Sequence, residues 1–138
     1  WICDNGKVEV IMEKVVRMLI DRKVKVCRIE SNRGGTLFAA DVQKRIRELN
    51  GITTITTKWT QTNKDVRIQT NAGWVKSHVL FRDTTVQNKE YRLAMTQLVE
   101  YTMSGRVKHD DVPDVLAMFV DMVVSSDMNT VVVMKRPF

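Results

Sequence analysis

The sequence predicts an α/β fold in which helices alternate with the strands of a sheet that has parallel neighbours. Two stretches with apolar residues at helical spacing, residues 7–22 and 38–49, alternate with two strand-like stretches, residues 24–30 and 52–62. This order is typical of α/β sheets. The 138 residues are 43% hydrophobic, enough for one core, so we expect a single domain over residues 1–138. The chain begins at Trp1 without an initiator Met, and we interpret it as a piece of a longer protein.

The first half gives the clearest element boundaries. The first predicted helix is amphipathic, with apolar residues on one face at Val8, Ile11, Met12, Val15, Met18 and Leu19. The predicted strand 24–30 ends at Glu30, and a tight loop follows at residues 31–35. The second helix should stop at Asn50-Gly51, a good C-terminal cap, and the Ile-Thr pattern of residues 52–62 favours a strand.

The second half is predicted to be mainly helical. We expect a helix from residues 63–65 to about 73–77, then a short strand at 78–81 and a polar linker at 82–88. A helix should follow over Tyr91 to Thr102, closed by Ser104-Gly105. After it we expect a helix to about Ser126 and a terminal strand or docked arm at 130–134.

The charge favours a polyanionic partner. The chain carries 22 Lys and Arg against 16 Asp and Glu, with a net charge of +6, although such a charge supports solubility as readily as a defined site. No apolar run approaches the roughly 20 residues of a membrane span, and we find no secretory signal, so we expect an intracellular protein that does not span a membrane. Cys3 and Cys27 are predicted to be free, buried thiols.

Residues 108–117 contain three acidic residues and are the main candidate for a cation-binding site. Pro113 suits the first turn of a helix and Asp111 should cap it, with an inward face formed by Val115, Leu116, Phe119, Met122 and Val123. Asp110 and Asp111 repel each other at this helix start, and a bound divalent cation would neutralise both. The alternative is that they are an N-cap residue and an ordinary first-turn acid.

Glu30 is a second candidate ligand. It ends a mostly apolar strand, and functional groups of open α/β sheets collect outside the carboxyl ends of the strands. The alternative is a solvated acid paired with Arg28 or Arg33.

Two basic or glycine-rich features are candidates for holding phosphate. Gly34-Gly35 allows close backbone approach to a phosphate, but it lacks the Lys-Ser/Thr of a nucleotide-binding loop, and the dinucleotide fingerprint is absent. Lys64 and Arg67 lie one helical turn apart and, with Arg33, are candidates for holding a phosphodiester; the alternative is a solvated basic face.

Three segments together resemble the C-terminal nuclease domain of tailed-phage large terminase subunits. They are residues 29–35 (IESNRGG), 63–75 (NKDVRIQTNAGWV) and 108–114 (KHDDVPD), in the same order and at similar spacing. The resemblance implies an RNase H-like mixed sheet flanked by helices. It also implies a metal-dependent DNA endonuclease that cuts concatemeric viral DNA during genome packaging.

Carried over by position, the resemblance implies that Glu30, Asp110 and Asp111 bind two Mg²⁺ or Mn²⁺ ions. His109 is implied as an auxiliary group, with Asp114 at the helix start orienting it. The implied partners are double-stranded DNA, a packaging ATPase domain, the small terminase and the portal, in the host cytoplasm.

One departure from the family's pattern concerns its first catalytic Asp, which lies on the first strand, upstream of the strand that we expect to begin at Trp1. We do not match Asp4 to that position, so the first strands of the sheet and one ligand are expected to be missing. Two alternatives therefore remain open. One is a catalytically incomplete DNA-binding or motor-docking module, and the other is a different RNase H-like nuclease of the resolvase or integrase type.

Overall fold

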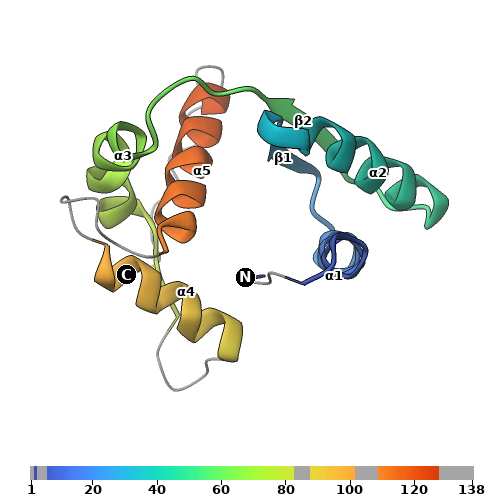
Figure 1. The fold of residues 1–138 in the computed structure, drawn as a ribbon, viewed down its shortest axis with the longest axis horizontal. Helices are drawn as coiled ribbons and strands as arrows, with labels where there is room; N and C mark the ends of the chain where they lie inside the picture. Colours follow the sequence, from blue (N-terminus) through green and yellow to red (C-terminus); the bar gives the residue numbers. More distant parts are fainter. Residues whose placement is uncertain (1, 3–5, 83–87, 102–108, 128–138) are drawn as a thin grey trace, which may run out of the picture. The chain divides into compact units, whose positions relative to one another are not determined.

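The computed structural model describes residues 2, 6–82, 88–101 and 109–127 (Figure 1). The chain divides into two compact units, Trp1–Gln61 and Thr62–Phe138, and each is considered by itself. Within the described ranges, no helix has both the length and the apolar character needed to cross a bilayer.

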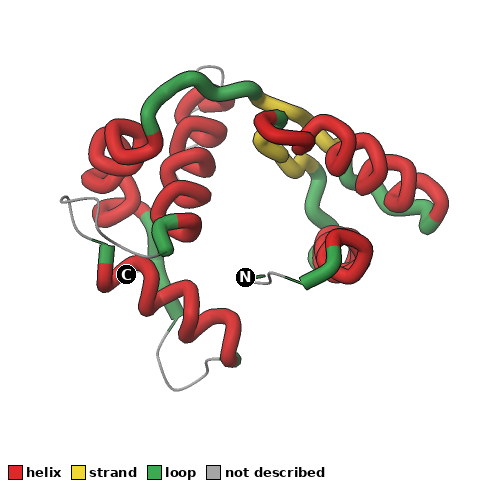
Figure 2. The backbone as a smooth tube through the Cα atoms, in the orientation of Figure 1, coloured by secondary structure: helices red, strands yellow, loops and turns green. Residues whose placement is uncertain are grey.

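Unit 1 combines two helices with a small parallel sheet (Figure 2). Its elements are α1 (Val8–Asp21), β1 (Val26–Glu30), the 3₁₀ turn η1 (Asn32–Gly34), α2 (Gly35–Glu48) and β2 (Thr54–Lys58). The strands are parallel, with Val26 opposite Thr54 and Glu30 opposite Lys58. The predicted α/β class and the parallel neighbours are confirmed. In the described residues the sheet has two strands, so the full mixed sheet stays a prediction.

The core of unit 1 lies where α1 meets α2. Val16, Val42 and Ile46 are completely buried, and Leu19 is nearly so. Burying each such side chain stabilises the fold by about 1.5–3 kcal/mol. The residues of the sheet that pack against this cluster are Cys27, Ile29 and Ile55. The core therefore holds β1 in place from one side.

Two further predictions on unit 1 concern a helix end and a thiol. Asn50 adopts the left-handed conformation with φ 55°, and the Gly51 N–H donates to the carbonyl of Ile46 at 2.8 Å, which confirms the predicted cap. Cys27 is free and half-buried, and burial raises the pKa of its thiol. Cys3 lies outside the described residues.

Unit 2 consists, in its described part, of three helices. They are α3 (Lys64–His78), α4 (Lys89–Glu100) and α5 (Asp111–Asp127). Both α3 and α4 pack against α5. Asparagine side chains cap the first two helices: the Asp65 N–H donates to Asn63 Oδ1 at 2.9 Å, and the Tyr91 N–H donates to Asn88 Oδ1 at 2.8 Å. The buried apolar residues of this unit are Ile68, Ala94, Val112, Leu116, Ala117 and Val120.

The strand predicted at residues 78–81 is wrong. Helix α3 continues through Gly73 to His78, and the Val79 N–H still donates to the carbonyl of Val75 at 2.9 Å. Leu80 beyond it is 89% exposed. The short apolar run therefore follows a helix end, and no strand pairs with it in the described part of the chain.

The inward face predicted for the last helix is partly wrong. Val115 and Phe119 are about half exposed, at 54% and 48%, whereas Leu116 is buried as predicted. The buried face is instead centred on Val112, Leu116 and Val120. Apolar residues surround most of this helix, so periodicity alone does not identify which strip the neighbouring helices cover. The predicted end of the preceding helix at Ser104-Gly105 and the terminal segment 130–134 lie outside the described residues.

Candidate functional site

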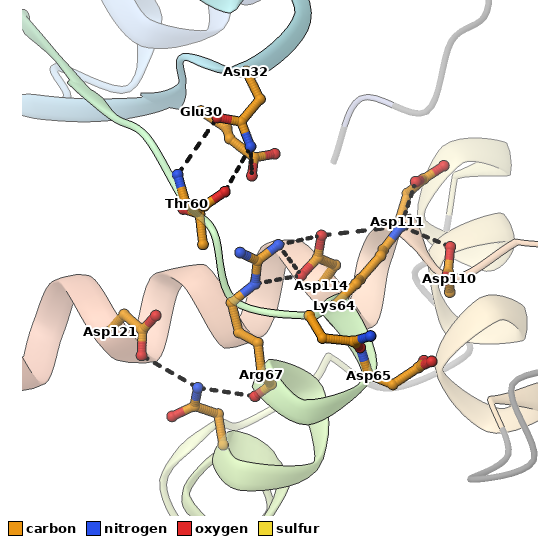
Figure 3. Close-up of polar contacts among 12 residues, drawn as sticks. Glu30, Asn32, Thr60, Lys64, Asp65, Arg67, Asp110, Asp111, Asp114 and Asp121 are labelled. Carbon is orange, nitrogen blue, oxygen red and sulfur yellow. Dashed lines mark hydrogen bonds and ion pairs between the residues drawn. The ribbon is translucent and has the colours of Figure 1, made fainter.

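Glu30 occupies the carboxyl end of β1, as the sequence predicts. It lies opposite Lys58, the last residue of β2. The side-chain amide of Asn32 donates to Glu30 Oε1 at 3.1 Å and to the carbonyl of Thr60 at 2.9 Å (Figure 3). The Thr60 N–H donates back to Asn32 Oδ1 at 3.4 Å. Asn32 therefore joins the ends of both strands and orients the carboxylate of Glu30.

The two glycines after β1 have different structural roles. Gly34 has φ 90°, in the left-handed region that glycine tolerates best, and it precedes α2 as its N-cap residue. At Gly35, an added Cβ would lie 1.8 Å from the carbonyl oxygen of Glu30. The absence of a side chain at Gly35 thus lets the first turn of α2 pack directly on the end of β1. The predicted phosphate contact of the two glycines stays a prediction, and the side chain of Arg33 is outside the described part.

In unit 2, the ammonium group of Lys64 lies close to three carboxylates at the start of α5. Lys64 Nζ lies 2.7 Å from Asp110 Oδ1, 3.1 Å from Asp111 Oδ1 and 3.9 Å from Asp114 Oδ2. The side chains of Lys64 and Asp110 are about one third exposed, while that of Asp111 is 78% exposed. The acidic pair is therefore open to solvent and is neutralised from the side of α3.

The cap of α5 differs by one residue from the prediction. The Asp114 N–H donates to the main-chain carbonyl of Asp110 at 3.2 Å, which places Asp110 at the N-cap and Asp111 in the first turn. Pro113 lies in the first turn as predicted. His109 is exposed just before the helix, and its predicted auxiliary role stays a prediction.

The charge state of Lys64 follows from two opposing effects. Partial burial lowers its pKa, but hydrogen bonds to Asp110 and Asp111, with their negative charges, outweigh burial and raise the pKa overall. Lys64 is therefore protonated at neutral pH and acts as a cation between the two carboxylates.

Arg67 is buried in an ion pair with Asp114, and the phosphate contact expected from its sequence position stays a prediction. Its side chain is 6% exposed, with Nε 2.7 Å from Asp114 Oδ1 and Nη2 2.8 Å from Asp114 Oδ2. Such a two-point contact is the geometry that a guanidinium makes best with a carboxylate. Asp114 therefore joins α5 to α3, which is a different contact from the predicted orientation of His109.

Sequence reasoning missed two residues that position these carboxylates. Gln97 on α4 is buried, and its Oε1 accepts a hydrogen bond from the Val112 N–H at 3.2 Å, which fixes the first turn of α5. Asn32 lies within the IESNRGG segment, but its residue type and position alone do not indicate that it contacts Glu30. The sequence carries no clear signal for Gln97, because the burial of Ala94 and Gln97 on α4 is seen only in the structure.

The donor atoms fit a hard divalent cation, but the described residues assemble no complete ligand set. Asp110 and Asp111 offer carboxylate oxygens, the ligands that Mg²⁺ and Mn²⁺ prefer, and the ammonium of Lys64 shows that a cation is stabilised between them. Among the residues described, no group of three or more His, Cys, Asp and Glu is placed to hold a metal. A complete site therefore requires further ligands besides Asp110 and Asp111.

Comparison with known proteins gives the family. Residues 3–80 match the model of the family described as the terminase of bacteriophage T7, ribonuclease H-like domain. The match spans more than half of the 138 residues, and the chain belongs to this family. It includes β1, the glycine pair and α3, whereas α4 and α5 lie beyond it. Searches of curated proteins and of solved structures give no match.

Proposed function

We propose that the chain is the nuclease part of a DNA-packaging terminase and hydrolyses phosphodiester bonds of concatemeric viral DNA with the help of divalent cations. The observation that supports this most is the exposed acidic pair at the rigid start of α5, already arranged around a cation, in a chain of the terminase family. The proposed partners are double-stranded DNA, the packaging ATPase domain, the small terminase and the portal. The proposed location is the host cytoplasm.

In this proposal, Glu30, Asp110 and Asp111 hold two Mg²⁺ or Mn²⁺ ions. Bound ions of this kind lower the pKa of an attacking water and stabilise the leaving oxygen of an in-line displacement. Carboxylates suit the role because they neutralise the cations through oxygen atoms. The ion pair of Arg67 with Asp114 and the hydrogen bond from Val112 to Gln97 keep the start of α5 fixed, so the acidic pair needs little reorganisation.

The remaining residues would bind DNA through its backbone. Lys64 is placed next to the acidic pair, where its ammonium can neutralise a phosphate once that phosphate approaches. The net charge of +6 adds a non-specific attraction for DNA, and we expect binding to weaken as salt is raised. The glycine turn beside Glu30 is a second candidate phosphate contact.

A second function is a DNA-binding or motor-docking module without nuclease activity. The observation that favours it is that the described residues contain no group of three potential metal ligands. Uptake of divalent cations separates the two proposals, since a docking module has no need to bind them.

The test is a plasmid-nicking assay with the full chain in Mn²⁺, using the isosteric variants Glu30→Gln, Asp110→Asn and Asp111→Asn. Each variant should lose nicking because it removes a negative ligand while keeping the shape of the side chain. Asp41→Asn, at an exposed position on α2, is the matched control and should nick as the wild type does. Thermal unfolding shows whether each variant is folded. Full nicking by folded Glu30→Gln and Asp111→Asn would overturn the proposal.

A further inference from the structure

Lys64 is placed where a cation bound to the acidic pair would lie. Its ammonium contacts Oδ1 of Asp110 and Oδ1 of Asp111, and it is 3.9 Å from Asp114. We infer that Lys64 is a built-in counterion of the pair, which a divalent cation must displace before the pair can bind it. The inference rests on the proposed function and adds a means of regulation to the same site.

Displacement follows from the positions of the charges. An ammonium and a divalent cation repel each other strongly at the separations set by two shared carboxylates. Arg67 does not compete in the same way, because its guanidinium is buried against Asp114, one turn further along α5. The cation and Lys64 therefore exclude each other from the pair, while the Arg67 contact that fixes α5 remains.

The position of Lys64 on its own helix also favours its release. It is the first residue of α3, and a positive charge at a helix N-terminus is unfavourable because the helix dipole is positive there. The attraction of Asp110 and Asp111 offsets this, and neutralising them with a cation removes the attraction. The side chain is about one third exposed and has a flexible stem, so the ammonium can turn toward solvent or toward a DNA phosphate.

The exchange couples two events. Loading of the cation frees Lys64 for a phosphate, so the cationic contact to DNA becomes available when the site is ready to cut. By linkage, a bound cation weakens the contact of Lys64 with the acidic pair by the same factor by which that contact weakens cation binding. Removing the Lys64 contact should therefore strengthen cation binding.

The experiment is a calorimetric Mn²⁺ titration of the full chain at fixed ionic strength, comparing the wild type with Lys64→Met. We expect the Kd for Mn²⁺ to fall roughly two- to tenfold, because the variant loses two partly exposed ion pairs of modest strength. Nicking at saturating Mn²⁺ should become slower, since the phosphate contact is lost. Lys76→Met is the matched control: it removes the same charge from an exposed position on α3 and should leave the Kd unchanged.

The outcomes separate this inference from the proposed function. If the wild type binds Mn²⁺ and nicks DNA but Lys64→Met binds Mn²⁺ equally or more weakly, the counterion role is wrong and the proposed function stands. If neither protein takes up Mn²⁺, both fail. Lys64→Gln, which keeps a polar side chain, provides the same comparison if Lys64→Met does not fold, and it too should bind Mn²⁺ more tightly than the wild type.

Discussion

The end of β1 and the start of α5 both present acidic side chains, but they are built by different means. Glu30 is held by the backbone, through strand pairing with Lys58 and the close packing of Gly35 on its carbonyl oxygen. The acids of α5 are held mainly by charge, through Lys64 and Arg67. Changing a charge at the helix start alters the contacts of Lys64 and Arg67, whereas the backbone contacts at the end of β1 do not depend on charge.

The difference assigns a separate task to each region. The carboxylate of Glu30 accepts a hydrogen bond from the neutral side-chain amide of Asn32. Asp110 and Asp111 are already paired with an ammonium, so any ligand they take must compete with it. We therefore expect a cation that binds at the helix start to replace this ammonium, while Arg67 and Gln97 keep the backbone of α5 in place.

The largest expected effect comes from breaking the buried pair of Arg67 and Asp114. Arg67→Met or Asp114→Leu alone should lower the free energy of unfolding of unit 2 by about 3–5 kcal/mol, because each removes one side of a buried two-point ion pair. The double variant should be considerably more stable than either single one. Urea unfolding followed by fluorescence measures this, with Trp1 and Trp59 changed to Phe so that Trp74 on α3 reports on unit 2.

Equal losses in the double variant and in the singles would contradict this account of unit 2. That result would mean that the volume of the two side chains, and not the pairing of their charges, holds α5 against α3.

A smaller effect is expected at the glycine that covers β1. Gly35→Ala should lower the stability of unit 1 by about 1–3 kcal/mol, because the new methyl group meets the backbone of Glu30 and one of the two elements must move. Gly73→Ala in α3 is the matched control: nothing lies within 4 Å of an added Cβ there, and we expect a gain of about 0.5–1 kcal/mol. Thermal unfolding measures the stability of both variants. A Gly35→Ala variant as stable as the wild type would show that this contact does not fix the end of β1.

Much of unit 1 was predictable because its signals are local. The end of β1 at Glu30 and the cap at Asn50-Gly51 follow from strand alternation and from turn residues, and the structure has both. Unit 2 was predicted less well, because apolar residues on most sides of α5 leave the choice of buried face to the neighbouring helices. The false strand at residues 78–81 has a similar cause, since a short apolar run carries no information on whether a partner strand exists.

The chemistry of the site was predicted better than its contacts. The sequence pointed to Glu30, Asp110 and Asp111 as the acids of interest, but not to Lys64 as the group that neutralises two of them. Lys64 and Asp110 are 46 residues apart, and no local pattern predicts an ion pair over such a separation. Arg67 and Lys64 are both basic residues in the first turn of the same predicted helix, so the sequence does not distinguish them. In the structure Arg67 is buried, whereas Lys64 is partly accessible.

The central claim is that Glu30 and the acidic pair of α5 serve the same cations, and Mn²⁺ titration of acid variants tests it most directly. We predict that the wild-type chain takes up two ions and that both Glu30→Gln and Asp110→Asn lose part of this uptake, while Asp41→Asn keeps it. Wild-type uptake by a folded Glu30→Gln variant would contradict the claim, because Glu30 would then take no part in binding the cations.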